Sequence, residues 1–223
     1  RKAVLGRLLD EAQRQSTPKP VRITPNQKVV RLAFVGRMMH QKRPILVLEI
    51  CRRLSRWGAK NGVSFHFDLV GEGPYLAAIQ TLVGRFGLQE QVRFHAAGTD
   101  VPALLGQSDV MILPSTNEGL ALVCYEAIEQ GCVPISSDVG AQSEIMPDAL
   151  LVPWAPGPAV RNTVSIVKRL LRDPDFAGQV ETELHARFAK LAAEPSARDV
   201  ISGIYAKAKT RAQDTAATSA DGD

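Results

Sequence analysis

Short apolar runs alternate with amphipathic stretches along the middle of the chain. The runs occupy residues 29–35, 64–70, 91–95, 109–114, 133–136 and 150–152. The first is apolar almost throughout, which is typical of a strand covered on both faces. Between the runs, apolar residues repeat at helical spacing, as they do from residue 45 to residue 54. This alternation predicts an α/β fold with a doubly wound parallel sheet and helices on both faces.

The two ends of the chain follow a different pattern. Val4, Leu5, Leu8, Leu9 and Ala12 form one helical stripe, and three prolines follow between residues 16 and 26. We expect a helix and a proline-containing linker over 1–28, the α/β domain over 29–211 and a disordered, small and polar tail over 212–223. Because the chain begins at Arg1, without an initiator methionine and in the middle of the predicted helix, we expect it to be a piece of a longer protein.

The composition favours a soluble protein without disulfides. No apolar run approaches the length of about 20 residues that a membrane-spanning helix needs. Cys51, Cys124 and Cys132 lack paired spacing and lie in apolar stretches, so we predict reduced thiols of a cytosolic protein. The net charge is +4, and its lysines and arginines are scattered without interleaved aromatic residues. This pattern argues against nucleic acid as a partner.

The segment STNEGLALVCYEAIEQG, residues 115–131, carries the clearest chemistry. It joins the apolar run at 109–114 to a helix that ends at Gly131. The first amides of such a helix have no partners within it and carry partial positive charge, which favours an anion. Glu118 stands at the mouth of the helix. Glu126 follows eight residues later, or about 12 Å along the axis, and carboxylates of a glycosidase pair are only roughly 5–9.5 Å apart.

Two carboxylates on either side of an anion site fit a ligand with hydroxyl-rich ends and an anionic middle. A nucleotide sugar has this shape, with a ribose, a diphosphate and a hexose in sequence. Each carboxylate would accept hydrogen bonds from a diol. The alternative is that both glutamates are solvated residues of an amphipathic helix, and the pair by itself does not exclude it.

Several ordered blocks of the sequence resemble the retaining glycosyltransferases of family 4, the group 1 glycosyltransferases. The blocks are LAFVGRMMHQKRP, FHFDLVGEGP, QVRFHAAG, SDVMILPSTNEG and NEGLALVCYEAIEQGCVPISSDVG, within residues 30–153. The last block matches the family signature of two glutamates separated by seven residues. The resemblance implies the C-terminal, donor-binding half of a GT-B glycosyltransferase, whose sheet is Rossmann-like.

The resemblance also implies a role for each matching residue. Arg37 and Lys42 would hold the donor diphosphate and neutralise the charge that builds on the leaving group. Glu118 would bind the transferred sugar, and these three are the predicted catalytic residues. The predicted donor-binding positions are Gly36, Gly71, Ala97, Gly119, Leu120, Ala121, Leu122 and Glu126, and Glu126 would bind the ribose.

Two positions depart from the family pattern. The family usually has Lys-Gly where this chain has Lys42-Arg43-Pro44, and Pro44 suits the first turn of a helix. The family often has Gly-Phe-Gly where this chain has Gly119-Leu120-Ala121. Alanine at 121 leaves less room for a phosphate to approach the backbone than glycine does.

The resemblance predicts transfer of a sugar, with retention, from a nucleoside-diphosphate sugar to a glycan or lipid-linked glycan. The acceptor would bind the missing N-terminal domain, so the chain alone would bind donor and be nearly inactive. We expect no cofactor and no protein-bound metal. We expect a cytoplasmic protein, and its basic surface also suits peripheral association with the inner face of the cell membrane. Two alternatives stay open: a non-catalytic nucleotide-sugar module, and a GT-B relative such as a nucleotide-sugar 2-epimerase.

Overall fold

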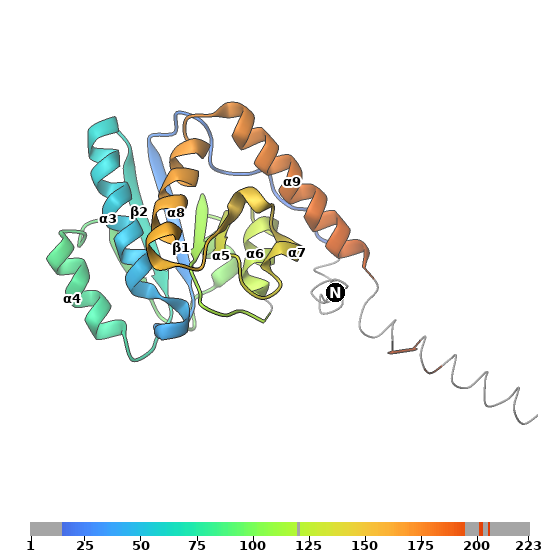
Figure 1. The fold of residues 1–223 in the computed structure, drawn as a ribbon, viewed down its shortest axis with the longest axis horizontal. Coiled ribbons are helices and arrows are strands. Elements are labelled where there is room, and N and C mark those ends of the chain that lie inside the picture. Colours follow the sequence, from blue (N-terminus) through green and yellow to red (C-terminus); the bar gives the residue numbers. More distant parts are fainter. Residues whose placement is uncertain (1–14, 120, 195–200, 203–204, 206–223) are drawn as a thin grey trace, which may run out of the picture.

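The computed structural model describes residues 15–119, 121–194, 201, 202 and 205. Its centre is a sheet of six parallel strands with helices packed around it (Figure 1). The strands follow the order β3-β2-β1-β4-β5-β6. The strands are β1 (Val29–Val35), β2 (Ser64–Val70), β3 (Val92–His95), β4 (Val110–Leu113), β5 (Val133–Ser137) and β6 (Leu151–Val152). Each corresponds to one of the six runs in the sequence, so the predicted doubly wound parallel sheet is confirmed.

Helices connect the strands. They are α3 (Pro44–Asn61), α4 (Leu76–Phe86), α5 (Val101–Leu105), α6 (Leu122–Glu129), α7 (Gln142–Ile145), α8 (Pro156–Leu170) and α9 (Pro174–Ala193), with 3-10 turns η1 (His40–Lys42) and η2 (Asp148–Leu150). The first helix begins at Pro44, directly before the helical repeat that starts at residue 45, whereas Lys42 belongs to η1. It ends at Asn61, and Gly62 follows with a left-handed backbone that closes the last turn.

The strand order explains why helices cover both faces of the sheet. From β1 the chain moves outward through β2 to β3, and it then returns to β4 and moves in the opposite direction. Right-handed crossovers therefore place α3 and α4 on one face and α6 on the other. Helix α8 packs against α3, whereas α9 contacts α6, α7 and α8. The order reverses between β1 and β4, and this reversal defines the switch point of the sheet.

The sequence pattern did not predict α5. This helix is a single short turn, so it offers too few residues for a helical period to show. Its start is nevertheless marked, because the Asp100 side chain accepts a hydrogen bond from the amide of Ala103 at 3.0 Å and Pro102 lies in the first turn.

The proline-containing segment before β1 lies against the domain. The amide of Lys19 donates to the carbonyl of Glu129 at 3.0 Å, and the amide of Arg22 donates to that of Gly131 at 2.9 Å. Ile23 is buried in the core. The segment from 19 to 23 is therefore packed along the end of α6. The helical stripe at 4–12 and the tail at 212–223 lie outside the described residues.

Buried apolar side chains fix the position of α6, the helix that follows β4. The Tyr125 ring stacks on Phe188 of α9 at a centroid distance of 4.3 Å, and both rings are fully buried. Cys124 beside it is buried and unpaired, as are Cys51 and Cys132, and burial raises the pKa of the Cys124 thiol to about 12. The cysteines thus belong to the core, as predicted.

Candidate functional site

The carboxyl ends of the strands carry the predicted site residues. Gly36 and Gly71 directly follow β1 and β2, and Ala97 lies two residues after β3. Gly71 has a φ of +129°, and a Cβ on it would lie 2.2 Å from the carbonyl oxygen of Gly36. Glycine at 71 therefore allows the turns after β1 and β2 to touch.

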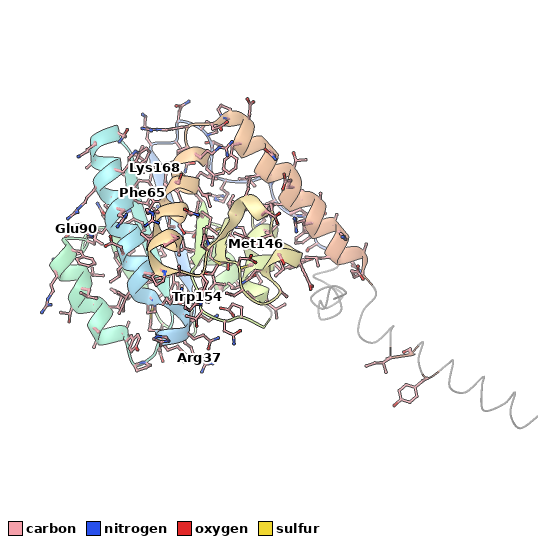
Figure 2. The ribbon with its side chains drawn as sticks, viewed as in Figure 1. Arg37, Phe65, Glu90, Met146, Trp154 and Lys168 are labelled. Atoms are coloured by element: carbon pink, nitrogen blue, oxygen red, sulfur yellow. The ribbon has the colours of Figure 1, made fainter. Side chains whose placement is uncertain are left out.

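A cavity of about 520 Å³ opens where these turns meet. Its lining includes the predicted residues Gly36, Arg37, Gly71 and Ala97. The volume lies within the range of about 300–1,000 Å³ that is usual for small-molecule sites. Arg37 is exposed at this end of the molecule, while Lys168 lies at the opposite end (Figure 2). Within the described part of the chain, the Arg37 guanidinium has no ion-pair partner, so it is available to an anionic ligand.

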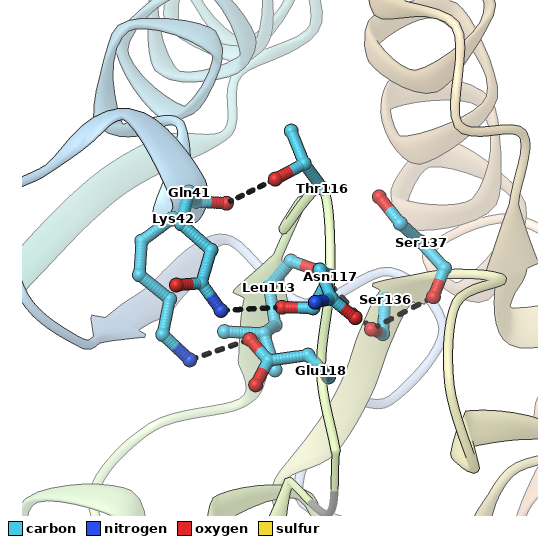
Figure 3. Close-up of polar contacts among 8 residues, drawn as sticks. All are labelled: Gln41, Lys42, Leu113, Thr116, Asn117, Glu118, Ser136 and Ser137. Carbon is cyan, nitrogen blue, oxygen red and sulfur yellow. Dashed lines mark hydrogen bonds and ion pairs between the residues drawn. The ribbon is translucent and has the colours of Figure 1, made fainter.

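Lys42 and Glu118 form an ion pair across the switch point. The Nζ atom of Lys42 lies 2.5 Å from Oε1 of Glu118 (Figure 3). Lys42 ends η1, in the loop after β1, and Glu118 lies in the loop after β4. The Glu118 side chain is only 8% exposed and that of Lys42 19%, so the pair is largely shielded from water. The structure thus joins two of the three residues that we predicted as catalytic.

The loops that carry these two residues are also joined by Gln41. The backbone amide of Thr116 donates to the carbonyl of Gln41 at 2.8 Å. The Gln41 side chain in turn donates to the carbonyl of Asn117 at 2.7 Å (Figure 3). Sequence reasoning missed Gln41, although its position beside Lys42 could have indicated it.

Gly140 supports Glu118 from the turn after β5. A Cβ at position 140 would lie 1.7 Å from the backbone carbonyl oxygen of Glu118, and Gly140 has a φ of +62°. Sequence reasoning gave Gly140 no role at the site. The only signal was a glycine at the end of a strand, which many turns share.

The N-terminus of α6 lies next to Glu118 in the chain. No side chain caps it. The amide of Cys124 donates to the carbonyl of Ala121 at 2.8 Å, and the amides before it have no partner within the helix. Ala121 precedes α6 with a φ of −88° and is 5% exposed. This backbone suits alanine, and its methyl group is buried, so the departure from glycine is accommodated. Gly119 and Leu122 are exposed, and Leu120 lies outside the described residues.

Glu126 lies on α6 and is partly buried. Burial is the main reason why the pKa of its carboxyl is raised, and the nearby charge of Glu129 adds to the effect. Among the described residues, no cation pairs with Glu126. A partly buried carboxylate without a cation can accept hydrogen bonds from the hydroxyl groups of a ligand.

Because the pKa of Glu126 is raised, we predict that Glu126→Gln increases the stability of the folded protein by an amount that depends on pH. A carboxyl whose pKa is raised by folding favours the folded state below its unfolded pKa, and this contribution is lost as the pH rises through the folded pKa. We therefore expect Glu126→Gln to change the free energy of unfolding little at a pH below 4.5, the ordinary pKa of a glutamate, and to increase the free energy of unfolding at neutral pH. Urea denaturation at both pH values measures this. The exposed Glu90→Gln is the control, and an equal gain from Glu126→Gln at both pH values would contradict the prediction.

Gly36 connects the cavity to the ion pair. It lines the cavity, and a Cβ on it would lie 3.3 Å from Cδ of Lys42. Lys42, Glu118 and Glu126 do not line the cavity themselves, so the edge consists of two neighbouring parts.

Among the described residues, no group of three or more histidine, cysteine, aspartate or glutamate side chains could hold a metal ion. The helices within that part of the chain are too short or too polar to cross a membrane.

The fold is that of an α/β domain with a cavity and an ion pair at the carboxyl edge of its parallel sheet. The family model of glycosyl transferases group 1 matches residues 15–194. The chain belongs to the group 1 glycosyltransferases.

Individual relatives agree with this family. An alpha-D-kanosaminyltransferase of Streptomyces kanamyceticus is 24% identical over 174 residues, which are 77% of this chain and 44% of the relative. The pneumococcal O-GlcNAc transferase, solved in complex with UDP and GlcNAc, superposes with a TM-score of 0.62 at 16% identity. That match covers 87% of this chain and 38% of the transferase.

An Anabaena protein solved in complex with UDP and glucose has a TM-score of 0.60 at 19% identity. It is matched over 84% of this chain and 49% of its own length. The chain therefore spans less than half of each of these proteins. At these identities the solved structures show the fold, which is that of one half of a GT-B glycosyltransferase.

Proposed function

We propose that this chain is the donor-binding half of a retaining glycosyltransferase that uses a nucleoside-diphosphate sugar. One observation carries the proposal: the Lys42–Glu118 pair lies at the switch point, beside the uncapped N-terminus of α6. Ligands of open α/β sheets bind outside the carboxyl ends of the strands at this point. A cation next to bare helix amides suits a diphosphate.

The proposed roles follow from the position of each side chain. The nucleoside would enter the cavity at the ends of β1, β2 and β3, with the diphosphate toward Gly36. The α6 amides, Arg37 and Lys42 would surround that diphosphate. Glu126 would accept hydrogen bonds from the ribose diol. Oε1 of Glu118 is paired with Lys42, so Oε2 would accept a hydrogen bond from a hydroxyl group of the transferred sugar.

These groups would stabilise the departure of the diphosphate. Negative charge builds on the leaving group as the glycosidic bond breaks, and fixed positive groups in a shielded site stabilise it more than water does. Lys42 is held in place before the donor arrives, so little reorganisation is needed. The positive charge required for this step would come from the chain itself, and we propose that no protein-bound metal is needed.

The second domain would bind the acceptor, which we propose to be a glycan or lipid-linked glycan. The decisive test is the stereochemistry of the product made by the two-domain protein, followed by proton NMR with UDP-, GDP- and ADP-sugars and simple acceptors. We predict a glycoside that keeps the anomeric configuration of the donor. A product of inverted configuration would contradict retention. Release of the nucleotide with epimerised sugar would instead support the epimerase alternative.

A further inference from the structure

Arg43 has an unusual backbone conformation for a residue with a side chain. Its φ and ψ are both 50°, in the left-handed region, and it stands between η1 and the first residue of α3. Glycine adopts this conformation without steric cost, whereas other residues are strained in it. Strain of this kind persists only where surrounding contacts compensate for it, and such places cluster at functional sites.

The compensating contacts come from Trp154, which lies between β6 and α8. One guanidinium nitrogen of Arg43, Nη1, donates to the carbonyl of Trp154 at 2.6 Å. The guanidinium carbon also lies 4.8 Å from the centre of the indole ring, which is a cation–π contact. The two residues are 111 positions apart in the chain. The contact therefore ties the loop after β1 to the segment after β6.

The loop is tied on its other side as well. Gln41, immediately before Lys42, is hydrogen-bonded to the loop after β4 through Thr116 and Asn117. Arg43, immediately after Lys42, is bonded to Trp154. The residues on each side of Lys42 are thus bonded to different segments, Gln41 through its backbone and side chain and Arg43 through its side chain. The flexible lysine side chain therefore starts from a defined position. Trp154 lies at the same end of the molecule as Arg37 (Figure 2).

We propose that Arg43 and Trp154 are a positioning pair that holds Lys42 for the donor diphosphate. The inference rests on the proposed function. Neither residue needs to touch the ligand, because the pair acts by limiting the orientations of the loop that carries Lys42. Its loss therefore lowers the affinity for a diphosphate only as long as Lys42 is present.

Arg43→Gly tests this proposal, because it removes the contact with Trp154 and also relieves the backbone strain. We expect it to shift the melting temperature by no more than about 3 °C. We expect it to weaken UDP binding about fivefold, as measured by calorimetry on this chain. Trp154→Ala should weaken UDP binding in the same direction, and Trp154→Phe, which keeps an aromatic face, should weaken it less.

A double-mutant cycle with Lys42→Met separates positioning from general damage. In the Lys42→Met background, Arg43→Gly should cause no further loss of UDP affinity. The matched control is Arg169→Ala, which removes a guanidinium 3.9 Å from the centre of the Phe176 ring near the other end of α8. This control should leave UDP affinity unchanged.

The outcomes distinguish this inference from the proposed function. If the unaltered chain binds UDP, and Lys42→Met weakens binding but Arg43→Gly does not, the positioning role is refuted and the donor site stands. An equal loss from Arg43→Gly with and without Lys42 also refutes it. GDP and ADP replace UDP as the probe if one of them binds instead. If neither the unaltered chain nor the two-domain protein binds any of the three, the proposed function fails and this inference fails with it.

Discussion

Replacement of Gly140 by alanine is expected to destabilise the protein and to abolish high-affinity nucleotide binding together. The added methyl group would lie 1.7 Å from the carbonyl oxygen of Glu118, and the backbone φ of +62° disfavours any side chain. The left-handed conformation costs roughly 1–2 kcal/mol and overpacking about 1–3 kcal/mol, so we expect a total loss of about 2–5 kcal/mol in the free energy of unfolding. The Glu118 loop must also move, which separates Glu118 from Lys42.

Gly62→Ala is the matched control for this prediction. Gly62 has nearly the same φ, +65°, but a Cβ there would have no neighbour within 4 Å. It follows the C-terminal end of α3, whereas the predicted site residue Lys42 lies just before the N-terminal end of that helix. We expect only the conformational cost of about 1 kcal/mol and unchanged nucleotide affinity. Urea denaturation and calorimetry measure both quantities, and equal effects of the two substitutions would refute the steric account.

Lys42→Met is expected to have the second largest effect, again on both stability and binding. The substitution keeps much of the aliphatic chain but leaves the Glu118 carboxylate, which is only 8% exposed, without its cation. Removing one partner of a shielded ion pair costs more stability than the intact pair contributes, because the other charge is left unpaired. We expect the free energy of unfolding to fall by about 2 kcal/mol, a moderate value because Lys42 is partly exposed. Nucleoside diphosphates should bind about 10- to 100-fold more weakly, because a charge-assisted contact is lost.

The double variant Lys42→Met/Glu118→Gln separates these two effects. With no unpaired carboxylate left, most of the lost stability should return, whereas the diphosphate affinity should stay low. Lys60→Met, an exposed lysine in the last turn of α3, is the control for the loss of one positive charge. If Lys60→Met weakens binding as much as Lys42→Met, the result is explained by nonspecific electrostatic attraction of the anion and not by a contact between Lys42 and the diphosphate.

Much of the fold followed from the sequence because strands and helices leave local patterns. The apolar runs marked all six strands, and parallel strands bring their carboxyl ends to one edge of the sheet. That rule placed Gly36, Gly71 and Glu118 at a common edge. The ion pair between Lys42 and Glu118 then follows from the topology, since β1 and β4 are neighbours in the sheet.

The supporting contacts could not be predicted in this way because they join segments with no shared local pattern. Gly140 touches Glu118 only because the turns after β4 and β5 meet at that point. Arg43 and Trp154 meet across the edge, although neither position has a periodicity that indicates a partner. The assignment of Arg37 to the diphosphate stays a prediction, since Arg37 lines the cavity and Lys42 does not.

The central claim is a nucleoside-diphosphate site along the carboxyl ends of β1, β2, β3 and β4, beside the N-terminus of α6. Calorimetric titration of this chain with UDP, GDP and ADP, each in EDTA and in Mg²⁺, tests it most directly, repeated on Glu126→Ala and Glu129→Ala. Glu129 carries the same charge on the same helix as Glu126.

The account predicts selective binding of one diphosphate, retained in EDTA and weakened at least about tenfold, or 1.4 kcal/mol, by Glu126→Ala alone. Equal weakening by both substitutions would contradict the assignment of Glu126 to the ribose. Absence of binding both by this chain and by the two-domain protein would contradict the donor site itself.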